Sequence, residues 1–224
     1  MAGPQANSLK PLFDFLTGLE KNNNKAWFDN HKASYAVAKG LFENLVNQLI
    51  LDLGAVENMA GVTAKDCVMR IYRDIRFSKD KTPYKTNMGA SIGPGGKKST
   101  RLSYYLHLAP HNHSMIAGGL HSPETTQLSK FREAIDRNPR PFKAILKNKE
   151  FQNYFGDLEG EKLKTVPQGY GRDHPEIELL RLKEVVVVHP LSDEVVLSTK
   201  FRSQVIATFS AMKPFLDYLN SVIE

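Results

Sequence analysis

Residues 67–77 read Cys-Val-Met-Arg-Ile-Tyr-Arg-Asp-Ile-Arg-Phe, and the alternation within this stretch is typical of an extended strand. Successive side chains of a strand point to opposite faces of a sheet. One face would carry Met69, Ile71, Arg73, Ile75 and Phe77. The other would carry Arg70, Tyr72, Asp74 and Arg76. We therefore predict a strand that continues into a polar loop, giving a strand-loop unit over residues 70–85.

This unit lies within the most basic part of the chain. Of the 224 residues, 30 are Lys or Arg and 24 are Asp or Glu, so the formal net charge is +6. Residues 70–101 contain nine basic and two acidic residues and carry +7, whereas the other residues contain 21 basic and 22 acidic ones. A positive charge confined to one segment predicts an anionic partner better than a diffuse one does.

Further strands and helices are expected on both sides of this unit. Short apolar runs bounded by turn residues predict strands near 88–92, 102–108, 114–120 and 185–188. Apolar residues at helical spacing predict helices over 9–19 and 25–53, another that begins at Ser122-Pro123-Glu124, and a last one near 201–219. We predict an α+β fold, an antiparallel β-meander flanked by N-terminal and C-terminal helices. One domain would span 1–224, with residues 1–8 disordered.

The strand-loop unit also contains the candidate site. Arginine presents a planar fork of donors that fits a carboxylate or a phosphate, and lysine adds a point charge. An acidic neighbour can orient a guanidinium, and a tyrosine hydroxyl can donate to a bound anion. The candidate ligand-binding residues here are Arg70, Arg73, Asp74, Arg76, Lys81, Tyr84 and Lys85. The alternative is a network of salt bridges with the surplus cations in solvent.

The same residues resemble a family signature. The pattern R-x-x-R-D-x-R-F-x-x-x-K-x-x-Y is typical of the domains of unknown function numbered 2461, and the residues at 70–84 match each fixed position. The resemblance extends to Trp27-Phe28, to Ala117-Gly118-Gly119 and to Asp173-His174-Pro175. It implies a single bacterial domain of this length, and it implies no particular reaction.

Other motifs are weaker. His174 follows Asp173 and is a candidate ligand-binding or acid–base residue, although Asp173 and Pro175 are also typical of a helix start. His107, His111, His113 and His121 lie within fifteen residues, yet no acidic ligand lies beside them, so we expect no metal site. The glycine-rich stretch 93–98 lacks the spacing of a phosphate-binding loop, and we expect a basic hairpin tip there. We expect no cofactor.

Three functions are compatible with this pattern, and an enzymatic activity is left open. The first is the binding of a small anion that bears a phosphate or a carboxylate. The second is the binding of single-stranded nucleic acid, with Phe77, Tyr84, Tyr104 and Tyr105 as stacking rings. The third is an interaction with an acidic protein. The single cysteine, Cys67, and the lack of a long apolar run favour a cytoplasmic protein without a membrane partner.

Overall fold

The computed structural model describes residues 8–224, so the expectation for residues 1–7 lies outside the described chain. The chain folds into two compact units. The first unit contains the residues up to Ser99 together with Tyr105–Ile116 and Pro190–Ile206. The second contains Thr100–Tyr104, Ala117–His189 and Ala207–Glu224. The single domain expected over 1–224 stays a prediction.

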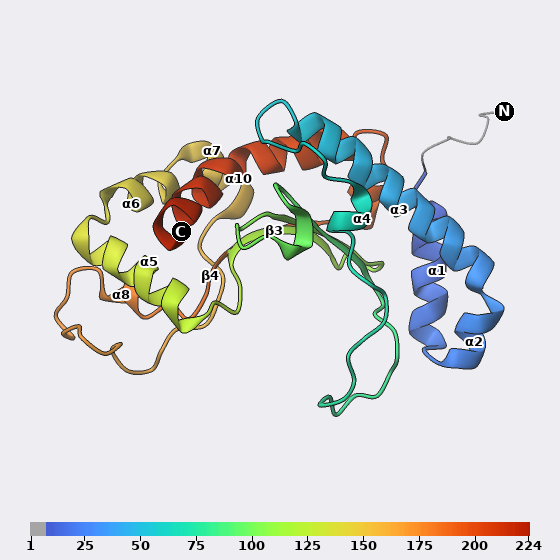
Figure 1. Cartoon of the computed structure of the whole chain (residues 1–224), viewed down its shortest axis with the longest axis horizontal. Coiled ribbons are helices and arrows are strands. Elements are labelled where there is room, and N and C mark those ends of the chain that lie inside the picture. Colours follow the sequence, from blue (N-terminus) through green and yellow to red (C-terminus); the bar gives the residue numbers. More distant parts are fainter. Residues whose placement is uncertain (1–7) are drawn as a thin grey trace. The chain divides into compact units, whose positions relative to one another are not determined.

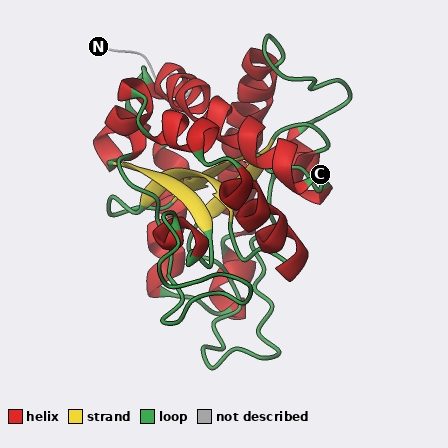
Figure 2. Ribbon diagram, turned by 90° about the vertical axis from the view of Figure 1, so that its left-hand side faces the viewer, coloured by secondary structure: helices red, strands yellow, loops and turns green. Residues whose placement is uncertain are grey.

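The fold class is α+β, as predicted. One antiparallel sheet has the strand order β1 (Met88–Ile92), β2 (Tyr104–Leu108), β3 (Ser114–Leu120) and β4 (Val185–Leu191). Figure 2 shows these strands in yellow among the helices. The four strands expected near 88–92, 102–108, 114–120 and 185–188 are confirmed in position. The alternation of β2 buries Tyr104, Leu106 and Leu108 and leaves the side chains of Tyr105 and His107 half-buried on the opposite face.

The first unit begins with a group of N-terminal helices. They are α1 (Lys10–Lys21), α2 (Lys25–Asn30), α3 (Lys32–Leu53) and the short α4 (Ala64–Cys67) (Figure 1). A 3-10 turn, η1 (Gly96–Lys98), follows β1, and α9 (Asp193–Leu197) follows β4. The α1 helix buries the face formed by Leu12, Phe13, Phe15, Leu16 and Leu19. This apolar face explains why α1 packs onto α3.

The single helix expected over 25–53 is wrong, because it is interrupted at His31. The His31 ring stacks on Trp27 at a centroid distance of 3.8 Å, and its Nδ1 lies 2.7 Å from the Trp27 carbonyl oxygen. That oxygen would accept the His31 N–H in a continuous helix. The His31 N–H donates to Phe28 instead, so α2 ends there and α3 begins at Lys32. Asn24 caps α2 by accepting from the Trp27 N–H at 3.0 Å.

The second unit contains α5 (Thr125–Arg137), α6 (Arg140–Leu146), α7 (Lys149–Phe155) and α8 (Ile177–Leu180), and the greater part of α10 (Phe201–Ile223). Its core is aromatic: Phe142 contacts Phe131, Phe215 and Tyr218 at centroid distances of 5.3, 6.0 and 5.2 Å.

The helix expected to start at Ser122 starts three residues later. Ser122 has a φ of +47°, outside the range that begins a helix, and Glu124 is the cap.

Among residues 8–224, none of the helices combines the length and the apolar character needed to cross a membrane. Likewise, no three metal-binding side chains come together within these residues.

Candidate functional site

Residues 68–87, which we call the arm, connect α4 to β1 as a long, irregular hairpin (Figure 1). One isolated bridge, Tyr72 to Tyr84, joins its two sides, and another, Val68 to Ala90, joins its first residue to β1. Three further backbone bonds run from Met69 N–H to Gly89 O, from Arg73 N–H to Pro83 O and from Lys85 N–H to Ile71 O. The regular strand predicted over 67–77 is therefore wrong. Cys67 ends α4, and Pro83 has no N–H with which to continue a ladder.

Arg73 holds the outer part of the arm together. Its Nη1 donates to the Thr82 carbonyl oxygen at 3.1 Å and also contacts the Asp80 carboxylate and the Thr82 hydroxyl. Its Nη2 lies 3.4 Å from the Ser78 hydroxyl. Bonds from the Thr82 N–H and from Arg73 lower the pKa of Asp80. Both terminal nitrogens of Arg73 thus bond within its own loop.

Two other predicted cations are also engaged within the arm. Arg76 forms a fork with Asp74, with Nε to Oδ1 at 2.9 Å and Nη2 to Oδ2 at 2.7 Å. This pair lowers the pKa of Asp74. Lys81 Nζ donates to the Ile75 carbonyl oxygen at 3.0 Å. These contacts lie at the tip of the arm, where the Phe77 side chain is 95% exposed.

Tyr84 anchors the arm to the helices. Its main chain pairs twice with the Asn23 amide, by donating its N–H at 3.1 Å and accepting at 2.9 Å. Its ring is only 5% exposed and stacks on Phe28 with a centroid distance of 4.1 Å. Burial raises the pKa of its hydroxyl. Tyr84 therefore serves as a packing residue of the arm.

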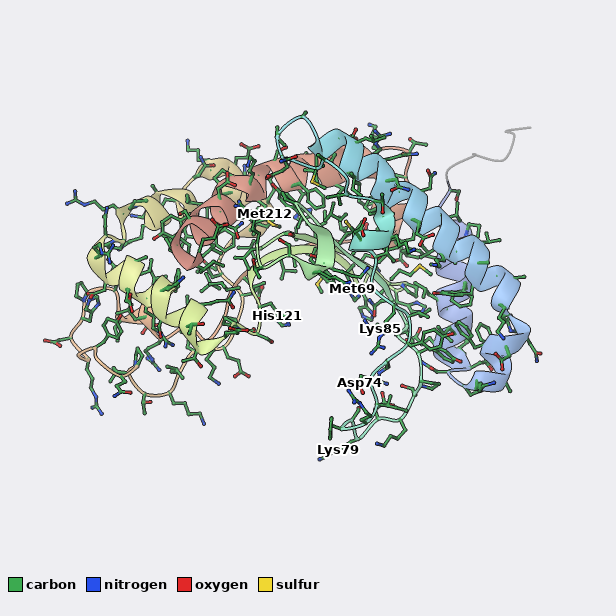
Figure 3. The ribbon with its side chains drawn as sticks, viewed as in Figure 1. Met69, Asp74, Lys79, Lys85, His121 and Met212 are labelled. Atoms are coloured by element: carbon green, nitrogen blue, oxygen red, sulfur yellow. The ribbon has the colours of Figure 1, made fainter. Side chains whose placement is uncertain are left out.

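The remaining predicted cations, Arg70 and Lys85, lie at the base of the arm. Lys85 lies where the arm meets the sheet, with Asp74 further out and Lys79 at the tip (Figure 3). In the described chain neither Arg70 nor Lys85 forms a salt bridge or a side-chain hydrogen bond. Lys85 is half-buried. Burial lowers the pKa of its ammonium group, and the charge of Arg70 acts in the same direction.

Asn87 at the end of the arm and two residues of β2, Tyr105 and His107, form a polar group in the first unit. Asn87 Nδ2 lies 3.3 Å from His107 Nδ1, and the rings of His107 and Tyr105 are 6.1 Å apart. Burial lowers the pKa of His107, and the charges of His113 and Lys85 add to this effect. Burial also raises the pKa of Tyr105. We call Arg70, Lys85, Asn87, Tyr105 and His107 the polar cluster.

Gly89 keeps the polar cluster close to the sheet. A Cβ atom at this position would lie 2.6 Å from the Tyr105 hydroxyl oxygen, so the hydroxyl rests directly over the β1 main chain. A side chain at residue 89 would displace Tyr105. The glycine therefore allows a hydroxyl, an imidazole and an amide to share one face of the first unit.

His174, the other predicted site residue, belongs to the second unit. Its Nε2 lies 3.0 Å from Asp136 Oδ1, and its Nδ1 accepts from the Glu176 N–H at 3.1 Å. Both ring nitrogens are thus used in holding the loop before α8. Of the other histidines, His111 lies 3.2 Å from Glu20 and His121 lies 3.1 Å from Glu184.

A pocket of about 450 Å³ lies elsewhere in the first unit, between α3 and the start of α10. Its lining includes Leu41, Leu45, Phe201 and Arg202. Arg202 forms a fork with Asp52 at 2.6 and 2.7 Å, which lowers the pKa of that carboxyl. The pocket thus lacks the unpaired positive charge that distinguishes the polar cluster.

The structure therefore separates the predicted residues of the arm into three groups. Arg73, Asp74, Arg76 and Lys81 are joined to one another or to the main chain of the arm, Tyr84 is buried, and Arg70 and Lys85 adjoin the sheet. The sequence interpretation did not include Asn87, Tyr105 and His107 among the candidate site residues. Alternation along 104–108 was the available signal, since it places Tyr105 and His107 on one face.

Comparison with known proteins gives one family. The model of the family described as "Conserved hypothetical protein (DUF2461)" matches residues 11–218, nearly the whole chain. No curated protein and no solved structure matches the chain. Because the family model spans both compact units, the match does not depend on the arm alone. The chain belongs to the DUF2461 family of conserved hypothetical proteins.

Proposed function

We propose that the protein binds a small anion, a compound bearing a phosphate or a carboxylate group, at the polar cluster. The observation that carries this proposal is the half-buried Lys85 ammonium group, which has no acidic partner among residues 8–224. Taking a cation out of water costs free energy unless an opposite charge compensates it. A bound anion would provide that charge.

The neighbours of Lys85 suit this role. Arg70 adds a second positive charge with free donors, and Asn87 and Tyr105 offer an amide and a hydroxyl. Arg73, Arg76 and Lys81 are less suitable, because each already bonds to an acceptor in the arm. The ligand site proposed here is therefore narrower than the whole basic segment.

Titration calorimetry with inorganic phosphate and with malonate tests the proposal. We expect Arg70→Ala and Lys85→Ala each to weaken binding at least about tenfold, or about 1.4 kcal/mol. The matched controls are Arg76→Ala and Lys81→Ala, which remove the same charges from the arm and should change the affinity less than about threefold. Equal losses in all four variants would indicate a diffuse charge effect and contradict a defined site.

The pH dependence gives a second readout of the same prediction. An anion favours protonated Lys85, so affinity should fall as the pH rises through the Lys85 pKa, which lies below its ordinary value of 10.5. The Lys85→Arg variant keeps its charge at high pH and should lose this fall. His107 has a lowered pKa and would add positive charge only in acid. Identical pH profiles for the two proteins would argue against Lys85 as the anion ligand.

The exposed Phe77 favours a second candidate function, an interaction with an acidic protein. Arg73 bonds across the tip, the Arg76 guanidinium lies 5.8 Å from the centroid of the Phe77 ring, and Lys79 is exposed. A preorganised aromatic side chain next to a cation is typical of an interaction hot spot. Stacking of nucleic acid is less favoured, because Tyr84 and Tyr104 are 5% and 2% exposed.

Photo-crosslinking from residue 77 tests this second candidate, with Leu51, which is 75% exposed, as the control position. A protein captured only from residue 77 would then be purified. It should bind Phe77→Ala and Lys79→Glu at least about tenfold more weakly than the unmodified chain. Unchanged affinity of both variants would exclude the tip as the contact.

A further inference from the structure

The pocket between α3 and the start of α10 has an apolar floor and a polar rim. Its volume of about 450 Å³ falls within the range of roughly 300–1,000 Å³ that is typical of small-molecule sites. The floor contains Leu9, Leu45, Val196 and Phe201, which are each at most 9% exposed. The rim contains Ser8, Asn44, Gln48, Ser198, Thr199 and Arg202. All of these residues belong to the first compact unit.

Two rows of side chains on α3 explain why floor and rim lie side by side. Residues four positions apart lie on the same face of a helix, one turn above the other. Leu41 and Leu45 form an apolar row, and Asn44 and Gln48 form a row of amides. A molecule in the pocket would therefore contact the leucines with an apolar body and the amides with a polar group.

The rim offers hydrogen bonds without a surplus charge. Within residues 8–224, Arg202 is the one charged side chain that lines the pocket, and its Nε and Nη2 donate to Asp52 at 2.7 and 2.6 Å. Its Nη1 donates to Gln48 Oε1 at 3.1 Å. In the described chain, the Asn44 amide and the Thr199 hydroxyl have no hydrogen-bond partner, so both are available to a bound molecule. Removing a charged group from water is costly without a compensating charge, and this rim has none to spare.

We infer that this pocket binds small uncharged molecules that have an apolar body and an alcohol or amide group at one end. The apolar body covers the floor, and the polar group exchanges hydrogen bonds with Asn44 and Thr199. A carboxylate or ammonium head group is disfavoured, because Arg202 and Asp52 already neutralise each other. This site goes beyond the proposed anion site and shares no residue with the polar cluster.

Titration with N-phenyl-1-naphthylamine tests the inference on the full chain. This probe is uncharged, fluoresces in apolar surroundings and carries a single N–H group. We expect one molecule to bind per chain and 1-octanol to displace it. Octanoate, which has the same chain length and a carboxylate, should need at least about tenfold higher concentration. Absence of a fluorescence increase would overturn the site, and equally effective octanoate would overturn the uncharged ligand class.

Two tryptophan variants of α3 locate the bound probe. Leu41→Trp adds a ring inside the pocket and should weaken binding at least about tenfold, because the ring takes up the space of the ligand. Val37→Trp adds the same ring one turn earlier, at a position that is 55% exposed and outside the lining, and should change the affinity less than about threefold. Equal effects of the two variants would show that the probe binds elsewhere and would overturn the inference.

Asn44→Ala tests the polar group at an exposed position, where the fold does not require the amide. Loss of one hydrogen bond should weaken displacement by 1-octanol about threefold or more. An unchanged affinity for 1-octanol would overturn the role of the amide row. Release of the probe as the protein concentration rises would identify a second copy of the chain as the occupant, and this result would also overturn the inference.

Discussion

Replacing Phe28 with alanine should destabilise the protein by about 3–5 kcal/mol, the usual cost of removing a buried phenyl ring. Phe28 is 2% exposed, and its ring stacks on Tyr84 at 4.1 Å and contacts Tyr35 at 5.1 Å. Its removal leaves a cavity where the arm meets the helices. Chemical denaturation of the variant and the unmodified chain would measure the loss, with both curves fitted to the same dependence of the free energy of unfolding on denaturant concentration.

Phe77→Ala is the matched control for this prediction. The same atoms are deleted from a ring that is 95% exposed and whose centroid lies 5.8 Å from the Arg76 guanidinium. We expect a change in the free energy of unfolding within about 0.5 kcal/mol. In Phe28→Ala, the N–H groups of Arg73 and Lys85 should also exchange faster with solvent, because the hairpin is anchored through Tyr84. Similar stability losses in both variants would contradict the anchoring role of Phe28.

The sheet could be predicted well from the sequence, and the arm could not. Strands such as β2 bury alternate residues, so Tyr104, Leu106 and Leu108 leave a clear period in the sequence. The arm has the same period over 67–77, yet its sides meet through isolated pairs. Side chains there take main-chain acceptors: Arg73 bonds to the Thr82 carbonyl and Lys81 to that of Ile75. Whether a side chain bonds to a main-chain carbonyl oxygen depends on the conformation of the folded loop, so it leaves no periodic signal in the sequence.

The sequence located the segment that contains the candidate site, but it did not show which residues form the site. Charge density located the basic stretch, and Lys85 was among the predicted ligands. Which cation is unpaired depends on contacts that cross the hairpin, such as Arg73 to Asp80, and these follow from the position of the turn. The pairing of Asn87 with His107 joins the residue before β1 to a residue of β2 twenty positions later. Only the strand register brings them together, and a sequence does not state that register directly.

Gly119→Ala should destabilise the second unit by about 2–6 kcal/mol, for two separable reasons. Gly119 has a φ of +121°, a backbone conformation that costs other residues about 1–3 kcal/mol. A Cβ there would also lie 2.1 Å from the Val185 carbonyl oxygen and 3.0 Å from Val186 Cα. These are backbone atoms of the neighbouring strand β4, so they cannot rotate away, and such overpacking costs about another 1–3 kcal/mol.

Two other glycines separate the strain from the clash. Gly61 has a φ of +73°, and nothing lies within 4 Å of a Cβ built there, so Gly61→Ala should show the strain alone, about 1–3 kcal/mol. Gly40 lies within α3 with nothing within 4 Å of a Cβ, so Gly40→Ala should stabilise the protein by about 0.5–1 kcal/mol. The expected order of unfolding midpoints in denaturant, from highest to lowest, is Gly40→Ala, the unmodified chain, Gly61→Ala and then Gly119→Ala. If Gly119→Ala were as stable as Gly61→Ala, the backbone of strand β4 would have to move away from residue 119 at Val185. The close approach of β3 to β4 would then not be what requires glycine at residue 119.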